Sequence, residues 1–140
     1  MAIKFFFADI SITLLERKKL KAFIKQLVVK EKKQLFFLSI IFCTDEYLLN
    51  INKQFLKHDF YTDIITFNLA DYTNVIEGEI YISVDRVRDN AKINSVSQTG
   101  ELHRVIFHGV LHLCGHYDKS ASEKKIMTSL ENACLMKYFS

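Results

Sequence analysis

One short segment constrains this chain more than any other: His108-Gly109-Val110-Leu111-His112-Leu113-Cys114-Gly115-His116-Tyr117-Asp118. His108 and His112 are four residues apart, so in a helix they lie on the same face, one turn from each other. Gly115 is typical of a helix end, after which the chain can turn back and bring Asp118 to the same point. Two imidazoles and a carboxylate are ligands that zinc binds in proteins. The segment therefore predicts a site for one zinc ion, or another transition metal, built on a central helix.

The same spacing occurs in the H-E-x-x-H-x-x-G-x-x-H motif of metzincin proteases, with two substitutions. Gly109 stands in place of the general-base Glu, and Asp118 in place of the last His. Because the residue that would deprotonate water is missing, we expect no peptidase activity. His116 is the alternative third ligand, but it lies only one residue past the helix-ending glycine, so the spacing favours Asp118. The structural alternative is a pair of core histidines that are hydrogen-bonded to the backbone.

Composition predicts one globular domain over residues 1–140, since 49% hydrophobic and 25% charged residues are ordinary for a chain with a single core. The apolar stretch at the N-terminus is interrupted by charges and is too short for a signal peptide or a membrane span. We therefore expect a cytoplasmic protein without a membrane partner. Cys43, Cys114 and Cys134 form no CxxC pair, so they are expected to be reduced core thiols without a disulfide-linked partner.

Apolar periodicity predicts an α+β fold in which a mixed four-stranded sheet packs with about five helices, the His-bearing helix being central. Strands are expected at Ile3–Phe7, Leu35–Cys43, Ile64–Phe67 and Ile76–Ser83. Helices are expected after capping boxes at Thr13-x-x-Glu16 and Ser120-x-x-Glu123, from Thr44 to about Phe55, and over Val84–Ala91, Thr99–Cys114 and Glu123–Tyr138.

Positive charge is concentrated between Glu16 and Lys33, where eight cations accompany two anions although the net charge of the whole chain is only +3. Such a cluster is either the solvated side of an amphipathic helix or a surface that binds phosphates. In the second case Lys18, Lys21 and Lys25 are the candidates for contact with phosphates, such as those of a nucleic acid.

Two further segments accompany the histidine motif: Asp59-Phe60-Tyr61-Thr62-Asp63-Ile64-Ile65-Thr66-Phe67 and Gly78-Glu79-Ile80. They are similar to D-x-P-T-D-V-L-S-F and G-D-I, and His108–Gly115 is similar to H-G-x-L-H-L-x-G. In this combination the chain resembles the YbeY family of bacterial endoribonucleases. The resemblance implies a zinc-dependent, single-strand-specific endoribonuclease that acts in rRNA maturation, at the 3′ end of 16S rRNA, and in ribosome biogenesis. It also implies ribosomal RNA and the small ribosomal subunit as partners.

Three positions depart from the family pattern: Asp118 stands for its third His, Tyr61 for a Pro, and Leu56 for an Arg that some members carry. A carboxylate ligand should make the metal a weaker Lewis acid than a third imidazole would. Arg104, one turn before His108, and Lys57 are the candidates for a replacement cation.

The sequence leaves the proton acceptor and the class of function open. Without a Glu at position 109, a metal-bound water, Asp63 or Glu79 has to manage the proton. The site itself predicts metal-assisted hydrolysis, and a hydrolase of a small substrate satisfies it as well as a nuclease does. A zinc-stabilised, RNA-binding ribosome assembly factor with little catalysis is the third possibility, because Leu56 and the missing base both fit weak activity.

Overall fold

The computed structural model describes residues 2–140 and has the α+β architecture that the sequence predicts. Along the chain its elements are β1 (Ile3–Phe7), α1 (Arg17–Lys30), β2 (Gln34–Cys43), α2 (Asp45–Leu56), β3 (Ile64–Asn68), β4 (Val75–Ser83), α3 (Val84–Ile93), α4 (Gln98–Leu113) and α5 (Ala121–Tyr138).

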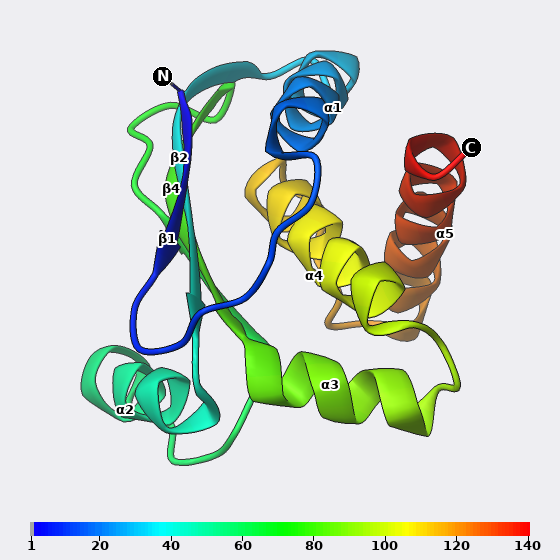
Figure 1. Ribbon diagram of the computed structural model, residues 1–140. Helices are drawn as coiled ribbons and strands as arrows, with labels where there is room; N and C mark the ends of the chain where they lie inside the picture. Colours follow the sequence, from blue (N-terminus) through cyan, green and yellow to red (C-terminus); the bar gives the residue numbers. More distant parts are fainter. Residues whose placement is uncertain (1) are drawn as a thin grey trace.

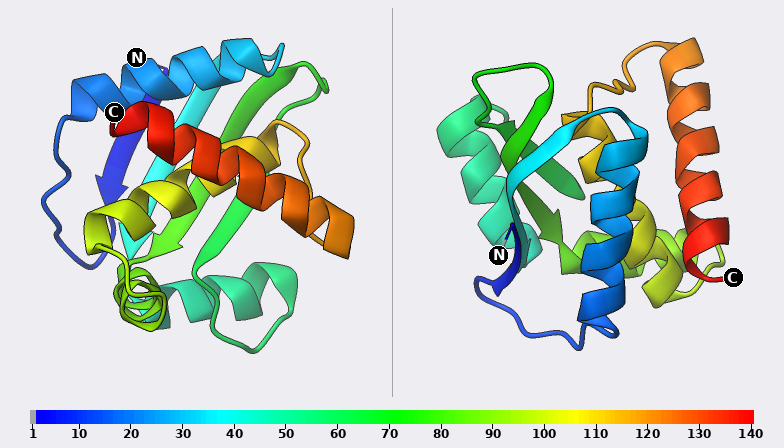
Figure 2. Two further views of the ribbon diagram at one scale, coloured as in Figure 1. Left: turned by 90° about the vertical axis from the view of Figure 1, so that its right-hand side faces the viewer. Right: turned by 90° about the horizontal axis from the view of Figure 1, so that it is seen from above.

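The four strands form one mixed sheet in the order β1-β2-β4-β3. The first three strands of that order are parallel, and β3 pairs with β4 in the antiparallel direction at the edge. Helices α1, α4 and α5 cover one face of the sheet, and α2 lies against the other face (Figures 1 and 2). The predicted central position of the histidine helix is confirmed, because α4 lies between the sheet and α5.

Burial along the strands follows the predicted patterns. The second half of β2 is buried throughout, and β4 alternates between buried and half-buried residues. All three cysteines are free thiols in the core, as expected. Within residues 2–140, no helix combines the length and apolar character needed to cross a membrane.

The two predicted capping boxes have different outcomes. Ser120 and Glu123 form the reciprocal capping box at the start of α5, as predicted. The box at Thr13 is wrong, because α1 begins at Arg17 and Glu16 precedes it in a left-handed conformation, with φ 51° and no side-chain cap. Leu14 is buried in the main core, and this burial holds the segment before α1 in a non-helical path. Tertiary packing therefore overrides the local capping signal.

Gly109 lets α4 lie unusually close to the sheet. A Cβ atom at this position would be 2.9 Å from side-chain atoms of Ile64 in β3 and Ile80 in β4. Both distances are shorter than ordinary van der Waals contact, so only glycine fits without a shift of the helix or of the two isoleucines. The position that carries the general base in metzincins is therefore a packing contact here.

We predict that Gly109→Ala destabilises the protein by about 1–3 kcal/mol, as is typical when an extra carbon is forced into a packed core. Gly100→Ala in the same helix is the matched control. The nearest atom to its added Cβ is the Ser97 hydroxyl at 3.0 Å, one exposed side-chain oxygen in place of two core isoleucines. Its loss of stability should therefore be clearly smaller than that of Gly109→Ala, since alanine also has the better helix propensity. Urea unfolding of both variants measures the difference, and equal stabilities would contradict the close-packing interpretation.

His103 is a buried histidine on the face of α4 that turns away from the other histidines. Its Nδ1 donates to the Thr99 carbonyl at 2.7 Å, and its ring stacks on Tyr138 with centroids 5.1 Å apart. Its Nε2 is buried without a partner among the described residues. Burial therefore lowers the pKa of His103 below its ordinary value.

This lowered pKa predicts a pH dependence of stability. As the pH falls below about 6.5, the unfolded chain protonates its histidine before the folded protein does, so the free energy of unfolding decreases. Replacement His103→Phe keeps an aromatic ring and removes the titration. The loss of stability between pH 8 and pH 5.5, measured by urea unfolding, should be smaller in the variant than in the wild type. The same loss in both proteins would show that His103 does not contribute.

Candidate functional site

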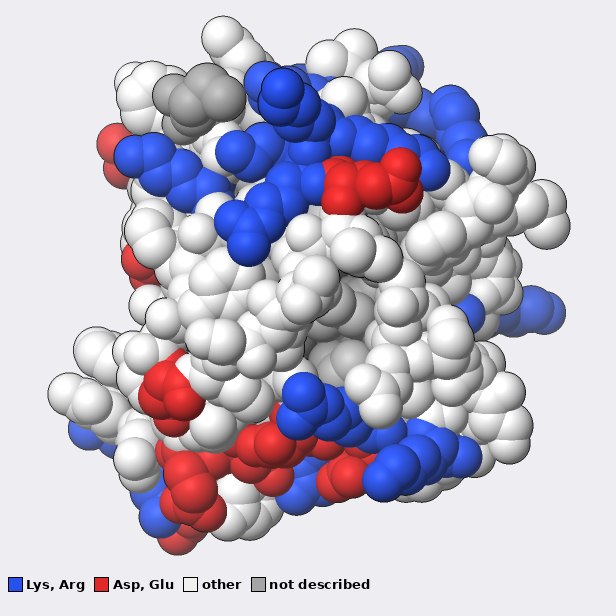
Figure 3. Space-filling model, in the orientation of Figure 1, with Lys and Arg blue, Asp and Glu red and all other residues white. Residues whose placement is uncertain are grey.

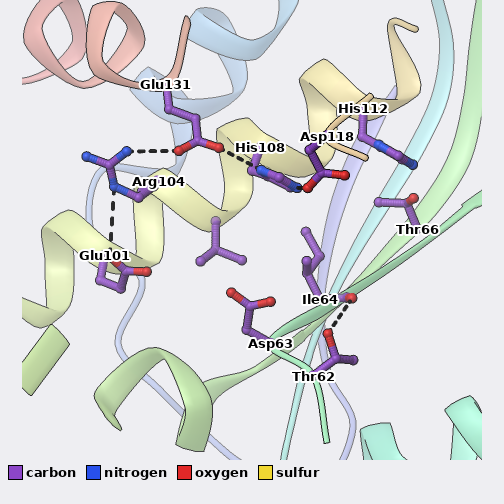
Figure 4. Close-up of a pocket in the computed structure, with 11 residues that line it drawn as sticks. Thr62, Asp63, Ile64, Thr66, Glu101, Arg104, His108, His112, Asp118 and Glu131 are labelled. Atoms are coloured by element: carbon purple, nitrogen blue, oxygen red, sulfur yellow. Dashed lines mark hydrogen bonds and ion pairs between the residues drawn. The ribbon is translucent and has the colours of Figure 1, made fainter. Parts of the chain in front are cut away.

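A polar cavity of about 430 Å³ opens between the edge strand β3, α4 and α5. Figure 4 shows the side chains that surround it: Thr62, Asp63, Ile64, Thr66, Glu101, Arg104, Val105, His108, His112, Asp118 and Glu131. The cavity thus brings together residues from three separate segments of the chain, and it contains both histidines of the predicted motif.

The histidines have the arrangement that their spacing predicts. The rings of His108 and His112 are parallel within 6°, with centroids 6.4 Å apart, on the cavity face of α4. The helix ends at Leu113, and Gly115 then takes a φ of +103°, a conformation that glycine adopts readily. The chain reverses there and places Asp118 Oδ2 3.4 Å from His108 Nε2.

His116 lies outside the cavity. Its Nε2 meets the carboxylate of Glu31, the residue that follows α1. Of the two candidates for a third ligand, the structure therefore brings Asp118 to the histidines and directs His116 to another partner. Asp118 as the third metal ligand stays a prediction, and the position of its side chain is compatible with it.

Glu131 is one of the cavity residues that sequence analysis missed, together with Glu101. One carboxylate oxygen of Glu131 lies 2.6 Å from His108 Nδ1, and the other accepts a hydrogen bond from Arg104 at 2.8 Å. Because Glu131 occupies Nδ1, the Nε2 atom of His108 is left facing the cavity and Asp118. A signal was present in the sequence: Glu131 continues the buried stripe of α5 formed by Met127, Cys134 and Tyr138. A carboxylate at such a position calls for a polar partner.

Arg104 is held by three neighbours. Its guanidinium donates to Glu131 and, at 2.9 Å, to Asn132 Oδ1, and it lies 3.9 Å from the buried carboxylate of Glu101. A guanidinium in this position offsets the charge of two acids, and two of its five N–H donors are engaged in hydrogen bonds. The structure therefore makes Arg104 a support of Glu131.

Burial and neighbouring charges shift the pKa values of the site. Burial disfavours the charged form of His108, but the hydrogen bond and charge of Glu131 outweigh it, so the pKa of His108 is raised. Burial lowers the pKa of His112. The His112 ring makes an edge-to-face contact with the Tyr117 ring, with centroids 5.6 Å apart. Burial also raises the pKa of Asp63, against the opposing effect of His108.

The two candidate carboxylates for proton transfer are in different places. Asp63 lies at the start of β3, where its carbonyl accepts a hydrogen bond from the Ser83 N–H at 2.9 Å and its carboxylate faces the cavity (Figure 4). Glu79 lies on the face of β4 that points away from α4, and its carboxylate accepts a hydrogen bond from the Tyr81 hydroxyl at 3.4 Å. The pleat of the strand directs Glu79 away from the histidines, so the structure does not bring it to the site.

The predicted basic cluster exists, but it does not line the cavity. Lys18 and Lys25 are exposed on α1, and the Lys21 ammonium lies 5.6 Å from the centre of the Phe5 ring. Figure 3 shows cations gathered at the end of the molecule where α1 lies in Figure 1. None of these three lysines lines the cavity, and the hollow that α1 and α5 share is a different one. Lys57, the other candidate cation, caps α2 and is also absent from the cavity wall.

The charges of the cavity favour a bound cation. Four carboxylates line it, with one guanidinium and two imidazoles: Asp63, Glu101, Asp118 and Glu131 against Arg104, His108 and His112. Nitrogen and oxygen donors of this kind fit a transition metal. Among residues 2–140, no group of three or more His, Cys, Asp or Glu side chains lies close enough together to hold a metal ion in the present side-chain positions.

Comparison with known proteins identifies the family and agrees with this fold. The family model described as "Endoribonuclease YbeY" matches residues 7–139. A curated relative of that name from Cytophaga hutchinsonii is 46% identical over 95% of this chain and 93% of its own length. Another, from Parabacteroides distasonis, is 44% identical over 96% and 94%. A solution structure of a Thermotoga maritima protein is similar with a TM-score of 0.66 and 25% identity, over 98% of this chain and 89% of that one.

The fold and the site define a single-domain α+β protein with one cavity of histidines and carboxylates beside its central helix. The chain belongs to the YbeY family.

Proposed function

We propose that this protein is a metal-dependent endoribonuclease that cuts single-stranded RNA. The observation that carries the proposal is the cavity, in which His108, His112 and Asp118 lie together in a chain whose curated relatives are named endoribonucleases. Metal-assisted hydrolysis of a phosphodiester uses a Lewis acid that polarises a phosphoryl oxygen and a group that accepts the proton of the attacking water. The cavity contains residues suited to both requirements.

The residues that would hold the metal are His108, His112 and Asp118, and zinc suits two imidazoles with a carboxylate. When bound, zinc supplies Lewis acidity for a phosphoryl oxygen and lowers the pKa of a water molecule. Glu131 supports this assignment, because it holds Nδ1 of His108 and so orients the Nε2 atom. His116 would have to leave Glu31 before it could replace Asp118.

Asp63 is the carboxylate that would accept the proton of the attacking water. It lies in the cavity, and burial raises its pKa toward the range in which a carboxylate is an effective general base. Glu79 points to the other face of the sheet and so cannot share this role. Arg104 would act through Glu131 and leave contact with the scissile phosphate to other groups.

The substrate we propose is ribosomal RNA, in maturation of the small subunit at the 3′ end of 16S rRNA, which would place the protein in the cytoplasm. The exposed lysines of α1 support an RNA substrate, because phosphate contacts supply most of the affinity of proteins for nucleic acids. These lysines do not line the cavity, so an RNA held on α1 alone is not yet at the proposed metal ligands. This separation favours the second candidate function, a zinc-stabilised assembly factor that binds RNA without cutting it.

The first test concerns the metal. We expect Asp118→Ala and His112→Ala to lose bound zinc, because each removes a ligand from the cavity. His116→Ala is the matched control and should retain zinc, because its imidazole is engaged with Glu31. Metal analysis after gel filtration measures the stoichiometry. Retention of zinc by Asp118→Ala to the same extent as by His116→Ala would refute the choice of third ligand.

The second test separates cutting from binding. Asp63→Asn should lower the rate of RNA cleavage by about 10²–10⁴-fold, the usual contribution of a general base, and leave RNA affinity largely intact. Glu79→Gln is the control outside the cavity and should cut normally. The assay is cleavage of a ribosomal RNA fragment together with a binding curve. Binding without metal-dependent cleavage by the wild type would favour the assembly factor, and neither activity would leave a hydrolase of a small substrate.

The role of α1 is tested by charge reversal. Lys18→Glu with Lys25→Glu should weaken RNA binding and reduce its salt dependence. The log–log slope should fall by about 0.9 for each duplex phosphate that the protein no longer neutralises, and by slightly less for a single strand. Arg88→Glu with Lys92→Glu on α3 makes the same change in net charge elsewhere on the molecule. Equal effects of the two double variants would show that only the overall charge matters.

A further inference from the structure

The loop between α2 and β3 presents an aromatic side chain to solvent beside the cavity. Phe60 is 56% exposed, and the His58 ring stacks on it with centroids 5.1 Å apart and planes 21° from parallel. Two and three residues further along the chain, Thr62 and Asp63 line the cavity. The aromatic pair therefore lies on the same short loop that supplies the proposed proton acceptor.

Several hydrogen bonds hold this loop in place. The buried Asn52 side chain donates to the Phe60 carbonyl at 2.8 Å, and the His58 N–H donates to the Asn52 carbonyl at 3.1 Å. Tyr61 donates its hydroxyl to Glu46 at 2.8 Å and stacks under the Arg86 guanidinium at 4.9 Å. The backbone that carries Phe60 is thus fixed on both sides while the ring itself stays exposed. An exposed ring on a fixed backbone loses little entropy when a ligand stacks on it.

Cations accompany the aromatic pair. The end of α2 and the loop carry Lys53, which is paired with Asp59 at 3.4 Å, and Lys57. The acids Glu46 and Asp63 lie on or against the same loop, so stacking, and not net charge, carries the argument for a ligand here. Aromatic rings next to cations are the usual means by which proteins bind single-stranded nucleic acids, because every base has a face that can stack. A base in a duplex has both faces covered by its neighbours and cannot stack in this way.

We propose that Phe60, supported by His58, is a stacking platform for a nucleobase of single-stranded RNA adjacent to the phosphodiester cut in the cavity. This proposal rests on the proposed endoribonuclease function and adds a subsite to it. The platform positions the strand by stacking, so it selects for unpaired RNA and not for a particular base.

The absence of tryptophan from the sequence makes a direct test possible. Phe60→Trp introduces a single fluorescent reporter, in an Asp63→Asn background that slows cutting. An eight-nucleotide oligoadenylate should quench its fluorescence, and an abasic ribose-phosphate strand of the same length should not. Tyr72→Trp is the matched control, because Tyr72 is 72% exposed in the turn at the opposite end of β3. Neither strand should quench that reporter.

An affinity measurement completes the test. Phe60→Ala should weaken binding of oligoadenylate about tenfold and leave binding of the abasic strand unchanged, and Phe60→Tyr should restore the affinity. In cleavage, the effect should appear in KM more than in kcat. Equal quenching by both strands, or an unchanged affinity in Phe60→Ala, would overturn the platform and point to a protein contact for Phe60.

The same measurements separate failure of the platform from failure of the function. If the wild type cuts RNA and Phe60→Ala has an unchanged KM, the platform is wrong and the nuclease stands. If oligoadenylate quenches Phe60→Trp but the wild type cuts no RNA, the platform stands and the nuclease is wrong. If the wild type neither binds nor cuts RNA, both proposals fail.

Discussion

The close contact between α4 and the sheet is the constraint on which the rest of the structure depends. Gly109 allows the helix axis to approach β3 and β4 until Ile64 and Ile80 occupy the space of a side chain. One side of α4 therefore packs against the sheet, and the side that carries His108 and His112 lines the cavity. A larger residue at 109 would move the histidines away from β3 and hence from Asp63.

The other wall depends on a single buried carboxylate. Glu131 joins α5 to α4 by accepting from Arg104 with one oxygen and pairing with His108 through the other. A buried carboxylate without partners would be strongly destabilising, so these contacts are needed to keep it in the core. They also fix which nitrogen of His108 faces the cavity. The same interaction therefore stabilises the helix pair and orients a proposed metal ligand.

The surfaces around the cavity divide the proposed tasks of RNA binding. The lysines of α1 lie away from the cavity lining, and the α2–β3 loop with Phe60 leads directly into Thr62 and Asp63, which line it. Long-range attraction of phosphates suits the first surface, because electrostatic forces act over about 10 Å at moderate salt. Stacking acts only at contact and suits the second. Together they would bring an unpaired strand to the cavity without recognition of its sequence.

The sequence by itself determined the elements and the histidine segment of the site, because both depend on local periodicity. The four strands, the helix carrying His108 and His112, the turn at Gly115 and the return of Asp118 all follow from residue spacing over a few turns. Only the tertiary structure decided which charged groups share the cavity. Glu131 comes from a helix more than twenty residues away, Glu79 is turned aside by the pleat of β4, and His116 is taken by Glu31. The failed cap at Thr13 has the same origin, since burial of Leu14 overrode it. Contacts between distant segments depend on how whole elements pack, and no local pattern in the sequence records that packing.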